Sequence, residues 1–329
     1  MSTAPRQRSI CTRLACTRLA WNRLAWNRLA LLVLLWAVIG LGLAGLPHQA
    51  AAAAGHVTIE SGGARRTAVI VERERLKLGR RPVIVVLHGG SGSGARVRRN
   101  LGLEDAIRSH NVTLVYPDAI DGHWGDTKET AQRDIDFLRT LIDQLIGNGT
   151  ADRRKIFIVG SSTGGMLALR IACDRAGQAY AGVATIIANL PADIAESCQP
   201  PKPIPLMVIN GTANPVMPYA GGKTTLGDSK IEVVSTDATL APFAKADGCG
   251  DGRTTLALPD KDPRDGTRSY LDKLNGCKAP IELIRIEGGG HTIPGRFSAG
   301  TTRGQPVGAH THDFDAAHVI WDFFRRLGA

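Results

Sequence analysis

Short, nearly continuous apolar runs alternate along the chain with segments of helical periodicity. The run from Val83 to Leu87 contains only aliphatic residues, which is typical of a strand buried on both faces of a sheet. Similar runs predict five further strands, over residues 112–116, 156–159, 183–188, 206–209 and 281–286. This alternation predicts an α/β fold with a mostly parallel central sheet and helices on both faces.

Two segments carry apolar residues at the spacing of three and four that amphipathic helices show. The first runs from Thr130 to Ile146, and the second from Asp313 to Leu327 near the C-terminus. Each predicts a helix that packs one face against the sheet. Between Asp247 and Pro280, Asp, Gly, Lys and Pro replace the strand-like runs. We therefore expect an excursion from the domain over about 247–280.

Residues 1–54 differ from the rest of the 329-residue chain. They contain arginines but no acidic residue, then an apolar run from Leu29 to Leu46 and a stretch of alanines, which are the three parts of a secretory signal peptide. We expect cleavage after Ala52 or Ala54, leaving a secreted, extracellular or periplasmic single domain over 55–329 without stable membrane insertion. The alternative is an uncleaved membrane anchor, since the apolar run is just long enough to cross a bilayer.

The formal net charge of +10 comes largely from this N-terminal segment. It holds six arginines and no acid, so 34 basic and 30 acidic residues remain beyond it, a net charge of +4. The remaining basic residues are scattered along the chain rather than clustered. A nucleic-acid partner is therefore not indicated.

Six cysteines are present, and Cys11 and Cys16 fall inside the predicted signal peptide. The four others are Cys173, Cys198, Cys249 and Cys277. An even number in an exported chain predicts two disulfides, for which three pairings are open. The spacing favours Cys173 with Cys198 and Cys249 with Cys277. No C-x-x-C pair occurs, so zinc or thioredoxin-type chemistry is not indicated.

The strongest chemical motif is Gly160-Ser161-Ser162-Thr163-Gly164, a G-x-S-x-G sequence between a predicted strand and a predicted helix. This is the context of the nucleophile elbow of α/β-hydrolases, in which the serine occupies a strained turn and its hydroxyl stands clear of the sheet. The flanking glycines are needed because the turn leaves no room for side chains. The motif predicts that Ser162 is a nucleophile, whereas the plainer alternative is an ordinary strand-to-helix turn.

A glycine-rich turn, His88 to Gly94, follows the first buried strand. Free backbone N–H groups in such a turn can hold an oxyanion. We expect one donor from Gly90 or Ser91 and another from Thr163, directly after the nucleophile. The alternative, a phosphate-binding loop, lacks the expected glycine and lysine spacing.

His291 ends the glycine run 288–290 after a predicted strand, which makes it the best candidate for the catalytic base. In chain order the third triad member falls between serine and histidine, after a late strand. That position is Asn214, an amide where a carboxylate is expected. His88 is interpreted as a structural hydrogen-bonding residue. His310 and His312 are read as surface residues, with a metal site including Asp315 as the weaker alternative.

The sequence resembles the secreted poly(3-hydroxybutyrate) depolymerase and feruloyl-esterase-like (LpqC-type) group of α/β-hydrolases. The matching pieces lie in order along the whole mature chain. They are Leu87-His88-Gly89, Tyr116-Pro117-Asp118, Gly122-His123-Trp124, Asp134 to Leu138, Gly160 to Met166, Gly211-Thr212, Pro218 to Gly222, Gly288 to Thr292, Pro294-Gly295, Phe314 to Ala316 and Ile320 to Phe324. The chain departs from the pattern at Asn214, where the group has aspartate, and at Ile293, where it has tryptophan.

The resemblance implies a secreted carboxylic-ester hydrolase without a cofactor or metal, acting on short hydroxyalkanoate oligomers, a polyester, or acyl and aryl esters of plant polymers. Acyl transfer to another acceptor would use the same residues. Trp124 and Tyr219 are candidate substrate walls, with ordinary packing as the alternative. Because asparagine cannot stabilise an imidazolium and could favour the wrong tautomer, two alternatives arise: a catalytically impaired ligand-binding homologue, or a substitute carboxylate such as Asp237 or Asp247.

Overall fold

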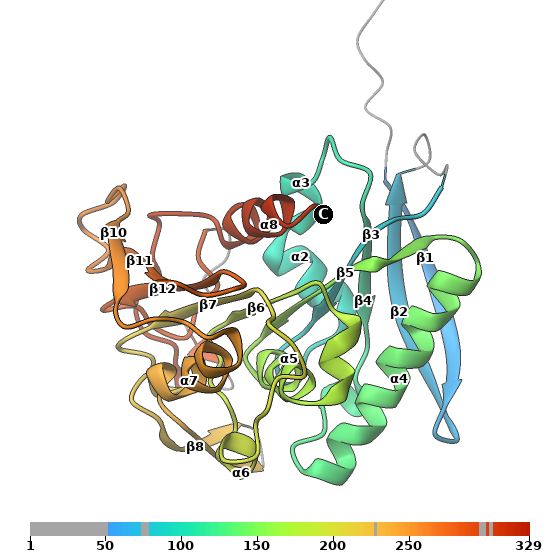
Figure 1. The fold of residues 1–329 in the computed structure, drawn as a ribbon, viewed down its shortest axis with the longest axis horizontal. Coiled ribbons are helices and arrows are strands. Elements are labelled where there is room, and N and C mark those ends of the chain that lie inside the picture. The colour runs from blue at the N-terminus through green and yellow to red at the C-terminus, as the bar shows by residue number, and fades with distance from the viewer. Residues whose placement is uncertain (1–51, 74–78, 227–228, 296–300, 303–304) are drawn as a thin grey trace, which may run out of the picture. The chain divides into compact units, whose positions relative to one another are not determined.

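The computed structural model describes residues 52–73, 79–226, 229–295, 301–302 and 305–329. They belong to one compact unit, residues 51–329, built around a ten-stranded sheet (Figure 1). The strands in spatial order are β1 (Ala52–Ser61), β2 (Ala64–Arg73), β4 (Thr113–Pro117), β3 (Arg81–Leu87), β5 (Ala151–Ser161), β6 (Gly182–Ile186), β7 (Leu206–Gly211), β12 (Ile281–Glu287), β11 (Arg268–Leu274) and β10 (Arg253–Ala257). The predicted signal peptide lies outside the described residues, apart from the last three positions, which begin β1.

The six strands from β4 to β12 run parallel, and the pairs at both sheet edges are antiparallel. Two short hairpins stand apart, β8 (Gly222–Leu226) with β9 (Ser229–Val233) and β13 (Thr301–Thr302) with β14 (Gln305–Pro306). All six predicted strands are present. The predicted α/β fold with a mostly parallel sheet is therefore confirmed.

Helices cover both faces of the sheet. They are α2 (Gly94–Leu101), α3 (Leu103–Ala106), α4 (Lys128–Gly147), α5 (Thr163–Cys173), α6 (Ala192–Ala195), α7 (Thr236–Asp247) and α8 (Ala316–Arg326), with short 3₁₀ turns η2 (Ile120–Gly122) and η3 (Arg175–Ala179). Figure 1 shows α2, α3 and α8 on one side and α4, α5 and α7 on the other. Both predicted helices are present, as α4 and α8. No helix in the described part of the chain is long and apolar enough to cross a membrane.

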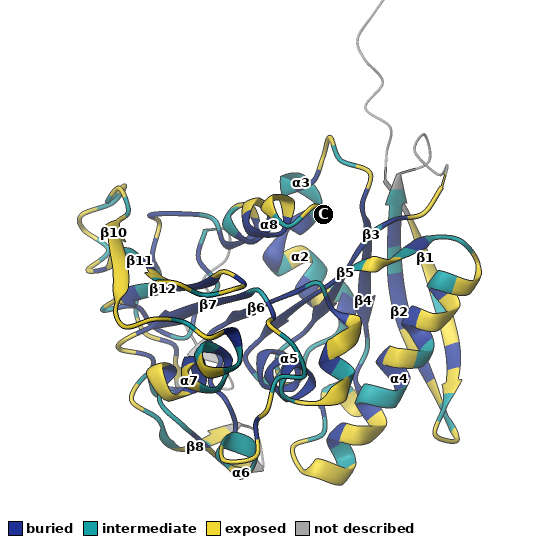
Figure 2. Cartoon of the chain, in the orientation of Figure 1, coloured by how far each residue is buried: buried dark blue, intermediate teal, exposed yellow. Residues whose placement is uncertain are grey.

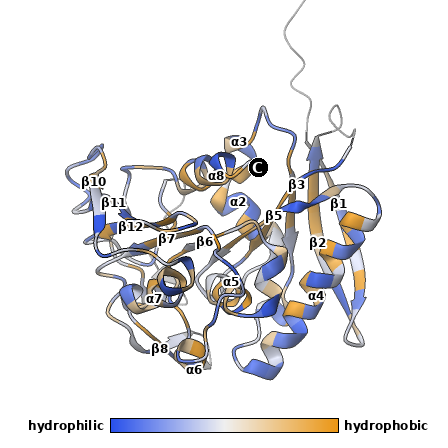
Figure 3. Ribbon diagram, viewed as in Figure 1, coloured by the Kyte–Doolittle hydropathy of each residue, from blue (hydrophilic) through white to orange (hydrophobic). Residues whose placement is uncertain are grey.

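Alternate side chains of the central strands feed two separate hydrophobic cores. In β3, Val83, Val85 and Leu87 join the core under α4 and α5, whereas Ile84 and Val86 join the core under α2 and α8. The strands are accordingly buried along their length, while the outer faces of the helices are exposed (Figure 2). Figure 3 shows the same division in hydropathy. The continuous aliphatic run is explained by burial on both faces.

The segment 247–280 differs from the sequence-based expectation. Strands β10 and β11 within it extend the sheet beyond β12, so this part of the chain belongs to the sheet rather than leaving it. All five residues of β10 are exposed, and β11 buries polar side chains such as Ser269 and Asp272. Edge strands of this kind lack the apolar pattern that reveals a buried strand. Strand β1 forms the opposite edge of the sheet and is mostly exposed, and β2 beside it was not among the predicted strands although it buries Ala68, Val69 and Val71.

The structure contains both disulfides that the cysteine spacing favoured. Cys173, the last residue of α5, is bonded to Cys198, and Cys249, just after α7, is bonded to Cys277, just before β12. Each disulfide therefore fixes a helix end to a neighbouring loop.

Asp247 at the end of α7 is fully buried and predicts a pH-dependent stability. One carboxylate oxygen accepts a hydrogen bond from the Ile204 N–H at 3.1 Å, and the other has no partner among the described residues. Burial raises the pKa of Asp247 to about 6. Because this value lies above that of the unfolded chain, the folded state gains stability as the pH falls from about 6 to about 4 and loses it as the pH rises through 6.

We expect Asp247→Asn to raise the free energy of unfolding at pH 8 by about 2–3 kcal/mol, with little change at pH 4. Urea denaturation at both pH values measures this difference. The control is Asp237→Asn, since Asp237 is an exposed carboxylate on the same helix, paired with Arg253. An equal effect of Asp247→Asn at both pH values would contradict the prediction.

Candidate functional site

Ser162 lies in a sharp turn between β5 and α5. Its backbone has φ 52° and ψ −121°, in the left-handed half of conformational space that side chains other than glycine rarely enter. A Cβ atom at Gly160 would lie 2.2 Å from the Gly164 carbonyl oxygen, and one at Gly164 would lie 2.4 Å from the His88 carbonyl oxygen. Only glycine fits at these two positions. The turn thus has the geometry that the G-x-S-x-G motif predicts.

Ser162, His291 and Asn214 come together at the carboxyl ends of β5, β12 and β7. The His291 Nε2 atom lies 3.1 Å from the Ser162 Oγ atom, and the His291 Nδ1 atom lies 3.1 Å from the Asn214 Oδ1 atom. These residues are 129 and 77 positions from His291 in sequence. The arrangement is that of a nucleophile, a base and a third residue that orients the base.

Glycines allow the two loops that carry Asn214 and His291 to approach. A Cβ atom at Gly211 would lie 2.2 Å from the Gly289 carbonyl oxygen, and the Gly289 carbonyl accepts a hydrogen bond from the Ala213 N–H at 3.0 Å. A side chain at Gly211 would therefore separate the base from its partner.

The orientation of the Asn214 amide is set by the backbone around it. Its Oδ1 atom accepts hydrogen bonds from the N–H groups of Val216 at 3.0 Å and Met217 at 2.8 Å. A rotated amide would place its NH₂ group against these two donors. The oxygen therefore faces His291, so Nδ1 carries the proton and Nε2 presents its lone pair to Ser162. The sequence-based concern that asparagine favours the wrong tautomer does not apply to this geometry.

The charge that an aspartate would supply is missing from the site. Burial lowers the pKa of His291 to about 4. Of the substitute carboxylates considered from the sequence, Asp237 pairs with Arg253 and Asp247 bonds to the Ile204 backbone, so neither orients His291. The imidazole is accordingly held neutral, with an amide as its partner.

The glycine-rich turn after β3 lies beside the nucleophile. A Cβ atom at Gly89 would lie 3.3 Å from the Ser162 Cβ atom, and one at Gly90 would lie 3.8 Å from the Thr163 side chain. Within the described chain, the backbone N–H groups of Gly90 and Thr163 have no protein acceptor. Ser91, the other donor considered, is exposed and has a φ of 52°. Gly90 and Thr163 are thus placed to donate to a shared ligand oxygen at the N-terminus of α5.

His88 and Trp124 hold this turn in place. The His88 ring donates from Nδ1 to the Gly89 carbonyl at 2.7 Å and accepts at Nε2 from the Ala119 N–H at 3.1 Å, which fixes a neutral tautomer. Burial lowers the pKa of His88. The Trp124 indole is 5% exposed and donates to the His88 carbonyl at 2.7 Å. The position of Trp124 therefore fits ordinary packing better than a role as a substrate wall.

Tyr219 is half-buried in the loop that follows Asn214. Its carbonyl accepts a hydrogen bond from the Thr236 N–H at 2.8 Å, and burial raises the pKa of its phenol to about 12. Within the described residues, no contact joins the Tyr219 ring to Ser162 or His291. A role in substrate binding stays a prediction for this residue.

Sequence reasoning missed the segment 307–309, which contacts the base loop. The carbonyls of Ala309 and Val307 accept hydrogen bonds from the N–H groups of Gly290 and His291. These contacts use backbone atoms only, so no residue type in this segment signals them. The chain returns to the site here only because of the tertiary fold.

The residues of the weaker alternative, a metal site, have other partners in the structure. His312 contacts Asp265, and Asp315 caps α8 and contacts His318. In the described parts of the chain, no group of three histidine, cysteine or acidic side chains lies close enough to hold a metal ion.

Comparisons with known proteins agree with the α/β-hydrolase fold described above. A family model described as the alpha/beta hydrolase family matches residues 84–297. The chain is 32% identical over 260 residues to "Putative esterase NocK" of Nocardia uniformis subsp. tsuyamanensis, covering 74% of each protein. It is 24% identical over 218 residues to feruloyl esterase B of Piromyces equi, covering 64% of this chain and 39% of that protein.

Among solved structures, an acetyl xylan esterase from Aspergillus awamori is similar in fold. The TM-score is 0.54 at 12% sequence identity, and the match covers 73% of this chain and 94% of that protein. At this identity the likeness concerns the fold alone.

Proposed function

Because this chain belongs to the α/β-hydrolase family, we propose that it is a secreted carboxylic-ester hydrolase that acts through a serine acyl-enzyme. The observation that carries the proposal is the line of contacts from Ser162 Oγ through His291 to Asn214, each at 3.1 Å. The esterase names of its relatives agree with it. The apolar N-terminal segment and the two disulfides support export.

In the first half-reaction, the Ser162 Oγ atom attacks the ester carbonyl and its proton passes to His291 Nε2. The carbonyl oxygen becomes an oxyanion, for which the N–H groups of Gly90 and Thr163 are the donors. The tetrahedral intermediate then collapses, the bond to the alcohol breaks, and His291 returns its proton to the departing oxygen. The products are a free alcohol and an acyl group on Ser162.

In the second half-reaction, water takes the place of the alcohol. It gives a proton to His291 Nε2 and attacks the acyl carbonyl, again with negative charge at Gly90 and Thr163. Collapse releases the carboxylic acid and returns the proton to Ser162. No cofactor is required, since every proton and electron pair is accounted for by these side chains, the ester and water.

The substrate class is proposed from the resemblance and the relatives together. Short hydroxyalkanoate oligomers and acyl or feruloyl esters of plant polymers both contain an ester carbonyl that a serine can attack. The two classes differ in the size of the acyl group. The similarity to a feruloyl esterase favours the second class, and the sequence motifs of the polyhydroxybutyrate depolymerase group favour the first. Hydrolysis of both, measured side by side, ranks them.

The proposal is tested with the full chain, a short acyl nitrophenyl ester and a fluorophosphonate that reacts with activated serines. We expect ester turnover, one phosphonate per chain on the peptide that contains Ser162, and loss of activity in proportion to labelling. Mass spectrometry locates the label. Full labelling of Ser162 with undiminished turnover would refute the mechanism.

A catalytically impaired homologue that binds an ester or polymer ligand is the second candidate, and Asn214 is the observation behind it. Without a carboxylate, the imidazolium formed in each half-reaction is stabilised only by a neutral amide oxygen. In that case the full chain would bind ester ligands without turnover. The same nitrophenyl ester assay separates the two candidates.

A further inference from the structure

The residues before the candidate base have no rigidity of their own. Gly288, Gly289 and Gly290 precede His291, and three consecutive glycines leave the backbone many accessible conformations. Yet the contact between His291 Nε2 and Ser162 Oγ at 3.1 Å requires a fixed imidazole. The constraint must therefore come from neighbouring parts of the fold.

The segment Val307–Asp313, here called the buttress segment, supplies that constraint on one side. The Gly290 N–H donates to the Ala309 carbonyl at 2.8 Å, and the His291 N–H donates to the Val307 carbonyl. A Cβ atom at Gly290 would lie 2.1 Å from the Val307 carbonyl oxygen, so the two backbones are in direct contact. The buttress segment thus holds the backbone of the base itself.

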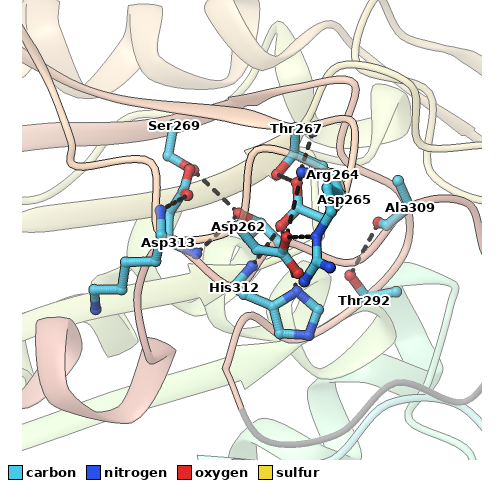
Figure 4. Close-up of polar contacts among 11 residues, drawn as sticks. Asp262, Arg264, Asp265, Thr267, Ser269, Thr292, Ala309, His312 and Asp313 are labelled. Carbon is cyan, nitrogen blue, oxygen red and sulfur yellow. Dashed lines mark hydrogen bonds and ion pairs between the residues drawn. The ribbon is translucent and has the colours of Figure 1, made fainter.

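On its other side, the buttress segment is tied to the loop between β10 and β11 by Asp265 (Figure 4). One Asp265 oxygen accepts from the His312 N–H at 3.0 Å and contacts the His312 Nδ1 atom at 3.3 Å. The other oxygen accepts from the Thr267 N–H at 2.8 Å and the Thr267 hydroxyl at 2.7 Å. The Asp265 side chain is 6% exposed, whereas the His312 side chain is 52% exposed, so the carboxylate is the buried partner of this pair.

A second contact joins the buttress segment to the same loop. The Asp313 carboxylate accepts a hydrogen bond from the Lys261 N–H at 3.1 Å, again between the buttress segment and the β10–β11 loop. Asp313 has one partner across this boundary, whereas the Asp265 carboxylate contacts both the N–H and the ring of His312 and is itself held by Thr267 in its own loop. Asp265 is therefore the principal link between this loop and the base.

We propose that Asp265 is a positioning residue for His291, acting through the buttress segment. This inference rests on the proposed function, in which His291 is the base. Asp265 does not touch the imidazole, so it acts by fixing the backbone from which His291 projects. The sheet extension formed by β10 and β11 thereby gains a role in catalysis, as the support of the base loop.

The test compares Asp265→Asn with Asp262→Asn in the full chain. Asp262 lies on the same loop, and among the described residues its side chain bonds only to Arg264, so it is a matched control. Because an amide cannot accept at both of its ends, Asp265→Asn loses hydrogen bonds to His312 or Thr267. We expect kcat per phosphonate-titrated site to fall about 10- to 100-fold at unchanged KM, and no change in the control.

A double-mutant cycle with His291→Ala separates positioning from a general structural effect. If Asp265 acts through His291, then Asp265→Asn has no further effect on the residual rate once His291 is alanine. An equal fold-loss in both backgrounds would overturn the proposal. Should Asp265→Asn not fold, Thr267→Val removes one donor to the carboxylate and is expected to lower kcat by a smaller factor in the same direction.

Hydrogen exchange gives a readout that does not depend on ester turnover. We expect the Gly290 and His291 amides to exchange at least about tenfold faster in Asp265→Asn than in the wild type, with no change in Asp262→Asn. Unchanged exchange at both amides would overturn the positioning role. Absence of ester turnover in the wild type would instead refute the proposed function, and the exchange result would still decide the role of Asp265.

Discussion

Ser162→Ala is expected to lower kcat for a short acyl nitrophenyl ester by at least about 1,000-fold. The substitution removes the atom that forms the acyl-enzyme in the proposed mechanism. Removal of a catalytic serine costs about 10⁶-fold in enzymes with a complete triad. A smaller factor is expected here because the amide partner limits the wild-type rate.

The neighbouring Ser161 is the matched control for this prediction. It is buried in the same motif, but its side chain lies beside Gly89 and makes no contact with His291. Ser161→Ala is expected to keep kcat within about threefold of the wild type. A loss in Ser161→Ala as large as that in Ser162→Ala would show that the motif is needed for folding, and would sink the nucleophile assignment.

Asn214→Asp is expected to raise kcat at pH 8 by about 10- to 100-fold. A carboxylate can accept the same bonds from the Val216 and Met217 N–H groups, so the geometry is kept. The change replaces a neutral hydrogen bond to the imidazolium by a charge-assisted one, worth roughly 1–3 kcal/mol more. Steady-state kinetics of both proteins on one ester measure the gain.

The same substitution is expected to move the acid limb of the pH profile upward. In the wild type, burial holds the pKa of His291 at about 4, so the base stays neutral and kcat/KM persists down to about that pH. A carboxylate at position 214 favours the charged imidazole and raises its pKa. Asn214→Asp should therefore lose activity at a higher pH than the wild type does.

Two outcomes would count against this reading of Asn214. An unchanged rate would mean that another carboxylate supports His291, and a lower rate would mean that the amide group itself is required.

Folding stability gives an independent check. Because the wild-type pKa of His291 lies below its unfolded value of about 6.5, the wild type loses stability as the pH falls from about 6.5 to about 4, and Asn214→Asp should lose less.

Much of the central fold was predictable because its signals are local. The strands that became β3 to β7 and β12 are buried on both faces, so their apolar runs stand out in the sequence. Strands β10 and β11 were not predicted, because β10 is exposed along its length and β11 buries polar side chains, so neither carries an apolar run. The edge strands are nevertheless the part of the sheet on which the Asp265 link depends.

The candidate site divides in the same way. The sequence by itself identified Ser162 as the candidate nucleophile, since the elbow needs small residues at fixed offsets around one strained turn. It also determined that an amide occupies position 214. Only the tertiary structure decided what that amide does. Its orientation depends on two backbone N–H groups, and the placement of His291 depends on backbone carbonyls of the buttress segment. Backbone donors and acceptors are present in nearly every residue, so no residue type marks them and only the folded chain brings them into position.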